Sequence, residues 1–214
     1  FQELATADAW RRSIINSLII GGGTTVLATV LGTMAALGLR PQGMRFVTPL
    51  RTLFILPMVV PAVVLGVGMQ LLFAQIGLAN TYLGVIVAHT IVAIPLVFIT
   101  VSGAVAGLDK RVELAAESLG ASPFTVLRKI TLPLAAPGIV SGAVLAFATS
   151  LDEVVLTLFV AGPNQRTLAR QMFSTIRENI SPAIAAAALI FIVGTIVLGV
   201  VTTLLRRRMK KAVV

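Results

Sequence analysis

The sequence lacks cysteine altogether and has a single histidine, His89, among its 214 residues. Disulfides, thiolate zinc sites and cysteine nucleophiles are therefore excluded, and one histidine cannot build a histidine metal cluster. The motif G-x-x-x-x-G-K-[ST] is also absent, so the chain cannot cradle ATP phosphates by that mechanism. We predict a protein with no catalytic residues, no metal site and no cofactor of its own.

Charge is scarce as well, because only 12% of the residues are charged while 57% are hydrophobic and the mean hydropathy is +1.00. Soluble domains of this length rarely carry so few charges, which indicates a membrane protein. A membrane-spanning helix takes about 20 mostly apolar residues. Such runs cover residues 13–39, 52–73, 83–103, 138–160 and 183–205. We expect one all-α domain over residues 1–214, a polytopic helix bundle whose spans are kinked at Pro57, Pro61 and Pro95.

The net charge of +9 raises the question of nucleic acid, but Lys and Arg fall between apolar runs rather than on one soluble face. Residues 40–51, residues 104–137 and the C-terminal tail together carry 12 basic residues, and the opposite side carries 5. Cytoplasmic loops are enriched in Lys and Arg. This predicts a cytoplasmic loop at 104–137, an external loop at 161–182 and no nucleic-acid partner. Because the sequence starts at Phe1, we also expect a sixth span upstream.

The loop at 104–137 carries the start and stop signals of two helices. Asp109 is a suitable cap for the first helix, and Gly120 suits a left-handed position at its end. Ser122 is a suitable cap for the second, with Pro123 at its first position. We expect this second helix to end near Ile130, before Pro133 and Pro137.

This pair of helices also carries more apolar surface than so short a loop can bury. The residues concerned are Leu119, Phe124, Val126, Leu127 and Ile130. A partner protein is the natural cover for them. The alternative is that the loop folds back against its own spans.

The spacing of Ala115, Ala116, Gly120, Ile130 and the pair Leu132-Pro133 resembles the EAA loop of type I ABC importer permeases. That pattern is Glu-Ala-Ala, three residues, Gly, nine residues, Ile, one residue, then Leu-Pro. One position departs, because Leu114 stands where the family has Glu, and the acidic residue comes one place earlier. Adjacent side chains on a helix project about 100° apart. The resemblance implies that the ATPase is coupled through Glu113, Ala115, Ala116, Gly120, Ser122 and Pro123.

Within that family, the stretch SLDEVVLTLFVAGP at 150–163 is most similar to the second permease subunit of spermidine/putrescine importers. The resemblance implies a six-helix fold, a bacterial inner-membrane location and an import cargo that is a polyamine. It also implies four partners besides lipid: a second permease subunit, identical or different in sequence with a different one favoured, two cytoplasmic ATPase subunits that bind ATP and Mg²⁺, and an external solute-binding protein. The chain itself would transmit hydrolysis and not perform it.

Asp152 and Glu153 stand side by side inside the apolar run at 138–160. Counting about 1.5 Å per residue from Gly138 places Asp152 roughly 21 Å along a span of about 30 Å, in its outer half. Carboxylates at such depth usually face a bundle interior or a water-filled path, where a cationic amine would supply the counter-charge. Two simpler interpretations stay open: the pair marks the helix end in headgroup water, or it hydrogen-bonds neighbouring helices.

Weaker polar signals lie elsewhere in the spans. His89 and Tyr82 are candidates for a pathway lining, although a histidine in a span more simply hydrogen-bonds another helix. Leu168, Met172 and Ile176 stand four residues apart and predict an amphipathic helix at the outer surface. Other cargoes also stay open, namely an amino acid, GABA or an opine, as do an ion-coupled secondary transporter and a membrane scaffold.

Overall fold

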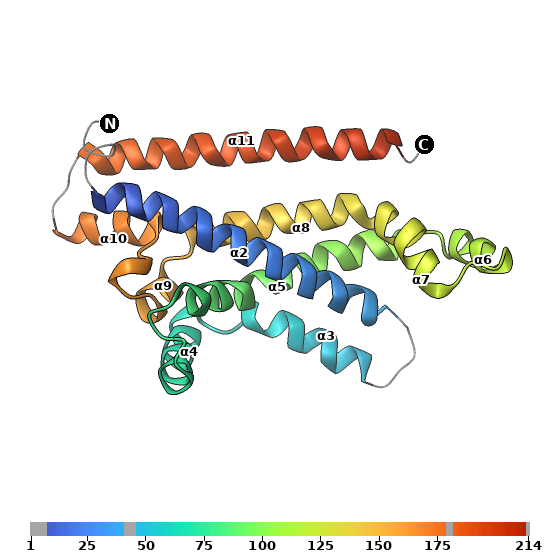
Figure 1. Ribbon diagram of the computed structural model, residues 1–214, viewed down its shortest axis with the longest axis horizontal. Helices are drawn as coiled ribbons and strands as arrows, with labels where there is room; N and C mark the ends of the chain where they lie inside the picture. Colours follow the sequence, from blue (N-terminus) through green and yellow to red (C-terminus); the bar gives the residue numbers. More distant parts are fainter. Residues whose placement is uncertain (1–7, 41–45, 179–181, 213–214) are drawn as a thin grey trace.

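In the computed structural model, which describes residues 8–40, 46–178 and 182–212, every regular element is a helix. Three long helices pack against one another to form the bundle: α2 (Asp8–Gly38), α5 (Tyr82–Ala106) and α8 (Leu132–Asp152). A fourth, α11 (Pro182–Ala212), runs along one side of them (Figure 1). The all-α helix bundle predicted from composition is confirmed. Arg45 and residues 179–181 of the predicted external loop lie outside the described residues.

Small residues set how closely these helices approach. A Cβ added at Gly142 of α8 would lie 2.6 Å from Thr100 Oγ1 and 3.0 Å from Val97 Cα of α5. A Cβ at Gly32 of α2 would lie 2.7 Å from Val97 Cβ. Val97 is fully buried where the three helices meet. In lipid, where no hydrophobic force drives helices together, such close contact is the main source of packing energy.

The predicted span at 52–73 is not one straight helix. It consists of α3 (Val47–Ile55), a 3₁₀ turn η1 (Leu56–Met58) and α4 (Ala62–Ile76), with a 97° bend between the two halves. Pro57 lies in the turn, and Pro61 precedes α4 with extended backbone (φ −56°, ψ 131°). Because proline has no N–H, each interrupts the hydrogen-bond ladder. The expected kinks at Pro57 and Pro61 are confirmed.

The predicted end of the second loop helix near Ile130 is wrong. From α7 (Pro123–Val126) the chain passes through a π-helical turn, η2 (Leu127–Thr131), directly into α8, so residues 123–152 form one helical run. The wider π turn changes the hydrogen-bond register just before Pro133, which then stands in the first turn of α8, where its missing N–H has least effect.

The other end of the predicted span at 138–160 differs too. α8 ends at Asp152, Glu153 is extended, and a short helix α9 (Val155–Val160) follows. A 3₁₀ turn η3 (Pro163–Gln165) then leads to the amphipathic helix α10 (Leu168–Glu178) that the sequence predicts.

The two ends of the bundle differ in what they carry. α6 (Lys110–Ser118) and α7 project from the same end at which α11 finishes, whereas α9 and α10 lie at the opposite end (Figure 1). The loop at 104–137 and the C-terminal tail therefore share one side, in agreement with their predicted common location. Within the part of the chain that the structure describes, four helices are long and apolar enough to span a membrane, and the bent α3–α4 pair can supply a fifth span.

Candidate functional site

The break between α8 and α9 is built by the carboxylate of Glu153. Its Oε1 accepts a hydrogen bond from the backbone N–H of Leu156 at 2.9 Å, which satisfies a free donor in the first turn of α9. Thr157 Oγ1 donates back to the Glu153 carbonyl at 2.9 Å. Glu153 thus caps the helix that follows through a residue three positions away, and its predicted place in the substrate pathway remains a prediction.

Asp152, the last residue of α8, is exposed. It lines a cavity of about 520 Å³ together with Glu153, Thr149, Phe191 and Thr195. It also lines an adjacent cavity of about 340 Å³ beside α10. No Lys or Arg of the described residues forms an ion pair with Asp152. Both neighbouring carboxylates therefore line this cavity without an ion pair among the described residues, and Glu153 in addition caps α9 through Oε1.

His89 of α5 hydrogen-bonds to both helices that flank this break, α8 and α9. It is fully buried, with Nδ1 2.8 Å from Ser150 Oγ on α8 and Nε2 2.9 Å from Thr157 Oγ1 on α9. Because Thr157 gives its only hydroxyl proton to the Glu153 carbonyl, His89 Nε2 must donate to Thr157, and in a neutral ring Nδ1 then accepts from Ser150. His89 therefore joins α5 to α8 and α9 by hydrogen bonds, as the simpler interpretation predicted.

The segment beyond α9 is fixed by hydrogen bonds to the bundle. Arg170 Nη1 donates to the carbonyls of Thr157 at 3.1 Å and Ala161 at 2.7 Å, which closes the C-terminal end of α9. Asn16 of α2 donates to the carbonyl of Asn164 at 2.8 Å, and Tyr82 Oη donates to Asn16 Oδ1 at 2.7 Å. Tyr82 thus serves this network of the fold.

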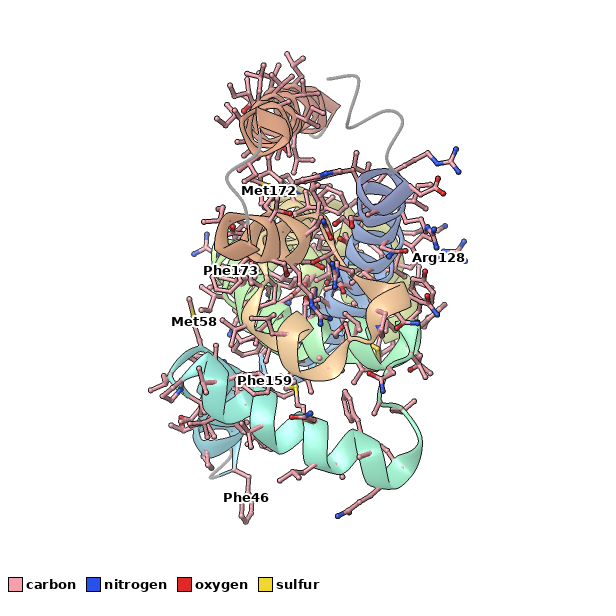
Figure 2. The ribbon with its side chains drawn as sticks, turned by 90° about the vertical axis from the view of Figure 1, so that its left-hand side faces the viewer. Phe46, Met58, Arg128, Phe159, Met172 and Phe173 are labelled. Carbon is pink, nitrogen blue, oxygen red and sulfur yellow. The ribbon has the colours of Figure 1, made fainter. Side chains whose placement is uncertain are left out.

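A view onto the same end shows how it is covered (Figure 2). In Figure 2, Met172 lies between α10 and α11, and it packs on a buried cluster that includes Trp10 and Ala187. Phe159 of α9 faces α4, where a Cβ at Gly66 would lie 2.5 Å from its ring (Figure 2). The broken span α3–α4 is therefore in direct contact with the helix that Glu153 caps.

At the opposite end, the two loop helices have the caps that the sequence predicts. Asp109 accepts from Arg111 N at 2.9 Å, and Ser122 accepts from Thr125 N at 3.3 Å with Pro123 next to it. Gly120 has φ +86°, the left-handed conformation that glycine adopts most readily. The predicted helix–turn–helix is confirmed.

The tip of this loop exposes its largest apolar side chains. Leu119 is 90% exposed and Phe124 is 70% exposed, on either side of the turn at Gly120. Ala115 is exposed and Ala116 is half-buried on α6. Val126, by contrast, is 5% exposed, so only part of the apolar surface folds back onto the chain. The exposed apolar surface that Leu119 and Phe124 form around Gly120 is called the knob below.

Glu113 does not join this knob, because it is engaged within the chain. Its Oε1 lies 2.6 Å from Arg40 Nη1, at the end of α2, and accepts from Thr131 Oγ1 at 2.6 Å. The Arg40 hydrogen bond, the largest effect, lowers the pKa of Glu113, with Thr131 and the charges of Arg40 and Lys110 adding to it against desolvation. Its predicted ATPase-coupling role remains a prediction; in this structure it ties α6 to α2 and η2.

Comparisons with known proteins show which family shares this sequence and fold. Residues 28–211 match the family described as binding-protein-dependent transport system inner membrane component. The chain is 33% identical over 208 residues to the spermidine/putrescine transport system permease protein PotC of Haemophilus influenzae, covering 97% of this chain and 81% of that protein. It is 36% identical over 216 residues to the molybdenum transport system permease protein ModB of Mycobacterium tuberculosis, covering 94% and 82%. The inward-facing MetNI methionine ABC transporter has the same fold (TM-score 0.78, 18% identity, 92% and 94% coverage).

The chain therefore belongs to the family of binding-protein-dependent inner membrane transport components. It is a permease subunit of an ABC importer in a bacterial inner membrane, a transport component and not an enzyme.

Proposed function

We propose that this permease forms half of the membrane pathway for a small organic cation, most consistent with a polyamine such as spermidine or putrescine. The observation that supports it is Asp152, a carboxylate without an ion-pair partner among the described residues, facing a cavity of about 520 Å³. A cation that leaves water needs its hydration replaced, and a carboxylate in a narrow path can supply part of it. Phe191 lines the same cavity, and the face of an aromatic ring attracts ammonium groups.

The relative named for spermidine/putrescine transport supports this assignment. The relative named for molybdenum transport is named for a different cargo. A negative side chain in the path would repel an anionic cargo and favour a cationic one. Glu153 would contribute twice, by capping α9 next to Asp152 and by adding a second carboxylate without an ion pair among the described residues to the same cavity.

Passage would be driven by partners that bind ATP and Mg²⁺. The importer would have two cytoplasmic ATPase subunits, and one of them would dock on the knob around Gly120, where Leu119 and Phe124 offer an apolar surface and Ser122 and Pro123 fix the turn. A second permease subunit of different sequence would complete the pathway, and an external solute-binding protein would deliver the cargo.

The test is uptake by the complete transporter reconstituted in vesicles, with its binding protein outside and ATP inside. We expect ATP-dependent uptake of labelled spermidine or putrescine, and none of a labelled oxyanion. Uptake of a neutral or anionic solute with no competition by polyamines would refute the cargo. Uptake without the ATPases would instead indicate an ion-coupled transporter.

A further inference from the structure

A cavity at the end of the bundle that carries α6 is lined by three basic side chains from three different elements. Its volume is about 400 Å³, and Arg40 after α2, Arg51 on α3 and Lys110 at the start of α6 line it. We call it the basic cavity. The tendency of basic residues to stay on the cytoplasmic side explains why they lie at this end. It does not explain why residues so distant in sequence face one hollow.

The charges around the basic cavity do not balance. Glu113 is the only carboxylate of the described residues that forms an ion pair with one of the three, Arg40. Asp109 stands beside Lys110 in sequence and is a second carboxylate near the cavity, where it caps α6 by accepting from Arg111 N. One positive charge is thus left over where Arg40, Arg51 and Lys110 are set against Glu113 and Asp109.

Hydrogen-bond donors are also left over. Arg40 uses Nη1 for Glu113, while its Nη2 atom is buried and has no hydrogen-bond partner among the described residues. Arg51 uses Nε and Nη2 for the carbonyl of Leu39, at 3.2 and 2.7 Å, and so uses two of its three nitrogens. A buried donor without a partner is costly, and an acceptor with several oxygens would remove that cost.

The basic cavity has apolar walls in addition to its basic rim. Ala36, Ile55 and Phe98 line its inner side, and Phe54 stacks on Phe98 with ring centroids 5.5 Å apart. An apolar wall below a rim of cations, at the end of membrane-spanning helices, is the arrangement that suits a lipid: acyl carbons against the wall and phosphate oxygens against the guanidinium groups.

We infer that the basic cavity binds a phosphate group, supplied by the headgroup of an anionic phospholipid. The inference does not depend on the cargo, and it goes beyond the proposed function, because no transported solute is involved. Free inorganic phosphate offers the same oxygens, so the experiment has to separate the two sources.

The experiment is a lipid titration of the complete purified transporter in detergent, followed by native mass spectrometry. The probes are phosphatidylglycerol, the zwitterionic phosphatidylcholine, and inorganic phosphate as a competitor. The charge variant is Arg51→Gln with Lys110→Gln; its control is Arg128→Gln with Lys129→Gln, two exposed basic residues of η2 that do not line the cavity. Each lost charge should weaken binding several-fold, about 10- to 30-fold for the pair.

A second variant keeps every charge and fills the cavity. Gly103 lines it, and a Cβ added there meets no atom within 4 Å, so Gly103→Leu should fold normally and still block the lipid. Arg51→Lys, which keeps the charge, should retain binding within about 3-fold of the unmodified chain.

The expected result is preferential retention of phosphatidylglycerol, weakened by the charge variant and by Gly103→Leu but not by the control. Binding of inorganic phosphate without retention of phosphatidylglycerol would overturn the lipid source and reassign the site to the free anion. Equal loss in the charge variant and its control would overturn the inference, because binding would then follow total charge. Equal retention in all variants, or no binding of either probe, would overturn it too.

Discussion

Replacing Glu113 by Gln removes one charge and keeps the size of the side chain, so it isolates what the ion pair with Arg40 contributes. Glu113 Oε1 accepts two hydrogen bonds of 2.6 Å, from Arg40 and Thr131, in a site where the two charged side chains are 23% and 17% exposed. Hydrogen bonds to a charged group contribute about 1.5–3 kcal/mol and neutral ones about 1 kcal/mol. Neutralising the acceptor should therefore cost roughly 2 kcal/mol in total.

That loss should appear as easier opening of α6, because Glu113 is the residue of α6 that bonds to the end of α2. Hydrogen–deuterium exchange of peptides from 110–118 in the complete transporter measures this opening free energy directly. About 2 kcal/mol corresponds to roughly 30-fold faster exchange. Glu117→Gln is the control, since Glu117 is on the same helix and forms no ion pair among the described residues.

The double variant Arg40→Gln with Glu113→Gln decides whether the pair acts as a unit. If it does, exchange in the double variant should match that of either single variant. If the two losses add to within about 0.5 kcal/mol, the residues act independently and the reasoning fails.

The effect also has a pH signature. Because Arg40 lowers the pKa of Glu113 below its ordinary value of 4.5, the contribution is fully present above that value and is lost as the pH falls through the lowered pKa. The difference between the unmodified chain and Glu113→Gln should be constant from about pH 5 to 8. A difference that already fades above pH 5 would contradict the assignment.

Three further predictions concern the loop, the break and the topology. Gly120→Asp should dissociate or uncouple the ATPase while membrane insertion persists, because a Cβ at φ +86° costs about 1 kcal/mol and obstructs the knob. The control is Gly107→Asp, at a right-handed glycine of the same end. Copurification of the ATPase with the Gly120→Asp variant, together with normal uptake, would refute the docking site. His89→Leu removes the hydrogen bonds from His89 to Ser150 and Thr157, so it should cost roughly 1–3 kcal/mol of stability and lower uptake. His89→Asn or His89→Gln should restore part of both. Unchanged melting and uptake in His89→Leu would show that these hydrogen bonds are dispensable. Cysteines introduced at Ser122 and Ser174 should react with impermeant reagents from opposite sides of the membrane, and labelling from one side would refute the orientation.

Local signals predicted much of this molecule. Asp109, Gly120 and Ser122 act through neighbours within three or four residues, so their caps and the turn followed from sequence. The apolar runs gave the helix bundle because lipid leaves the backbone few alternatives. Pro133 was misread as a helix end, since a π turn upstream moves it into a first turn, and sequence periodicity does not reveal such a change of register.

The long-range features of the candidate site were out of reach. Arg40 and Glu113 are 73 residues apart, and Arg40 counted only as a charge that fixes topology. Asp152 and Glu153 look equivalent in sequence, and only the fold shows that both line one cavity while Glu153 also caps α9. The two hydrogen bonds of His89 join α5 to α8 and α9, and the only sequence signal for them was a polar residue in an apolar run.

The central claim is that Asp152 supplies the negative charge that a cationic cargo meets, and its most direct test is polyamine uptake by the complete transporter carrying Asp152→Asn. Attraction between unit charges at about 4 Å is on the order of 4 kcal/mol at an effective dielectric of 20, and desolvation removes part of it. We therefore expect uptake at limiting substrate to fall by roughly 10-fold or more, with the ATPase still assembled and basal hydrolysis unchanged. Uptake at the unmodified rate in Asp152→Asn would contradict the account.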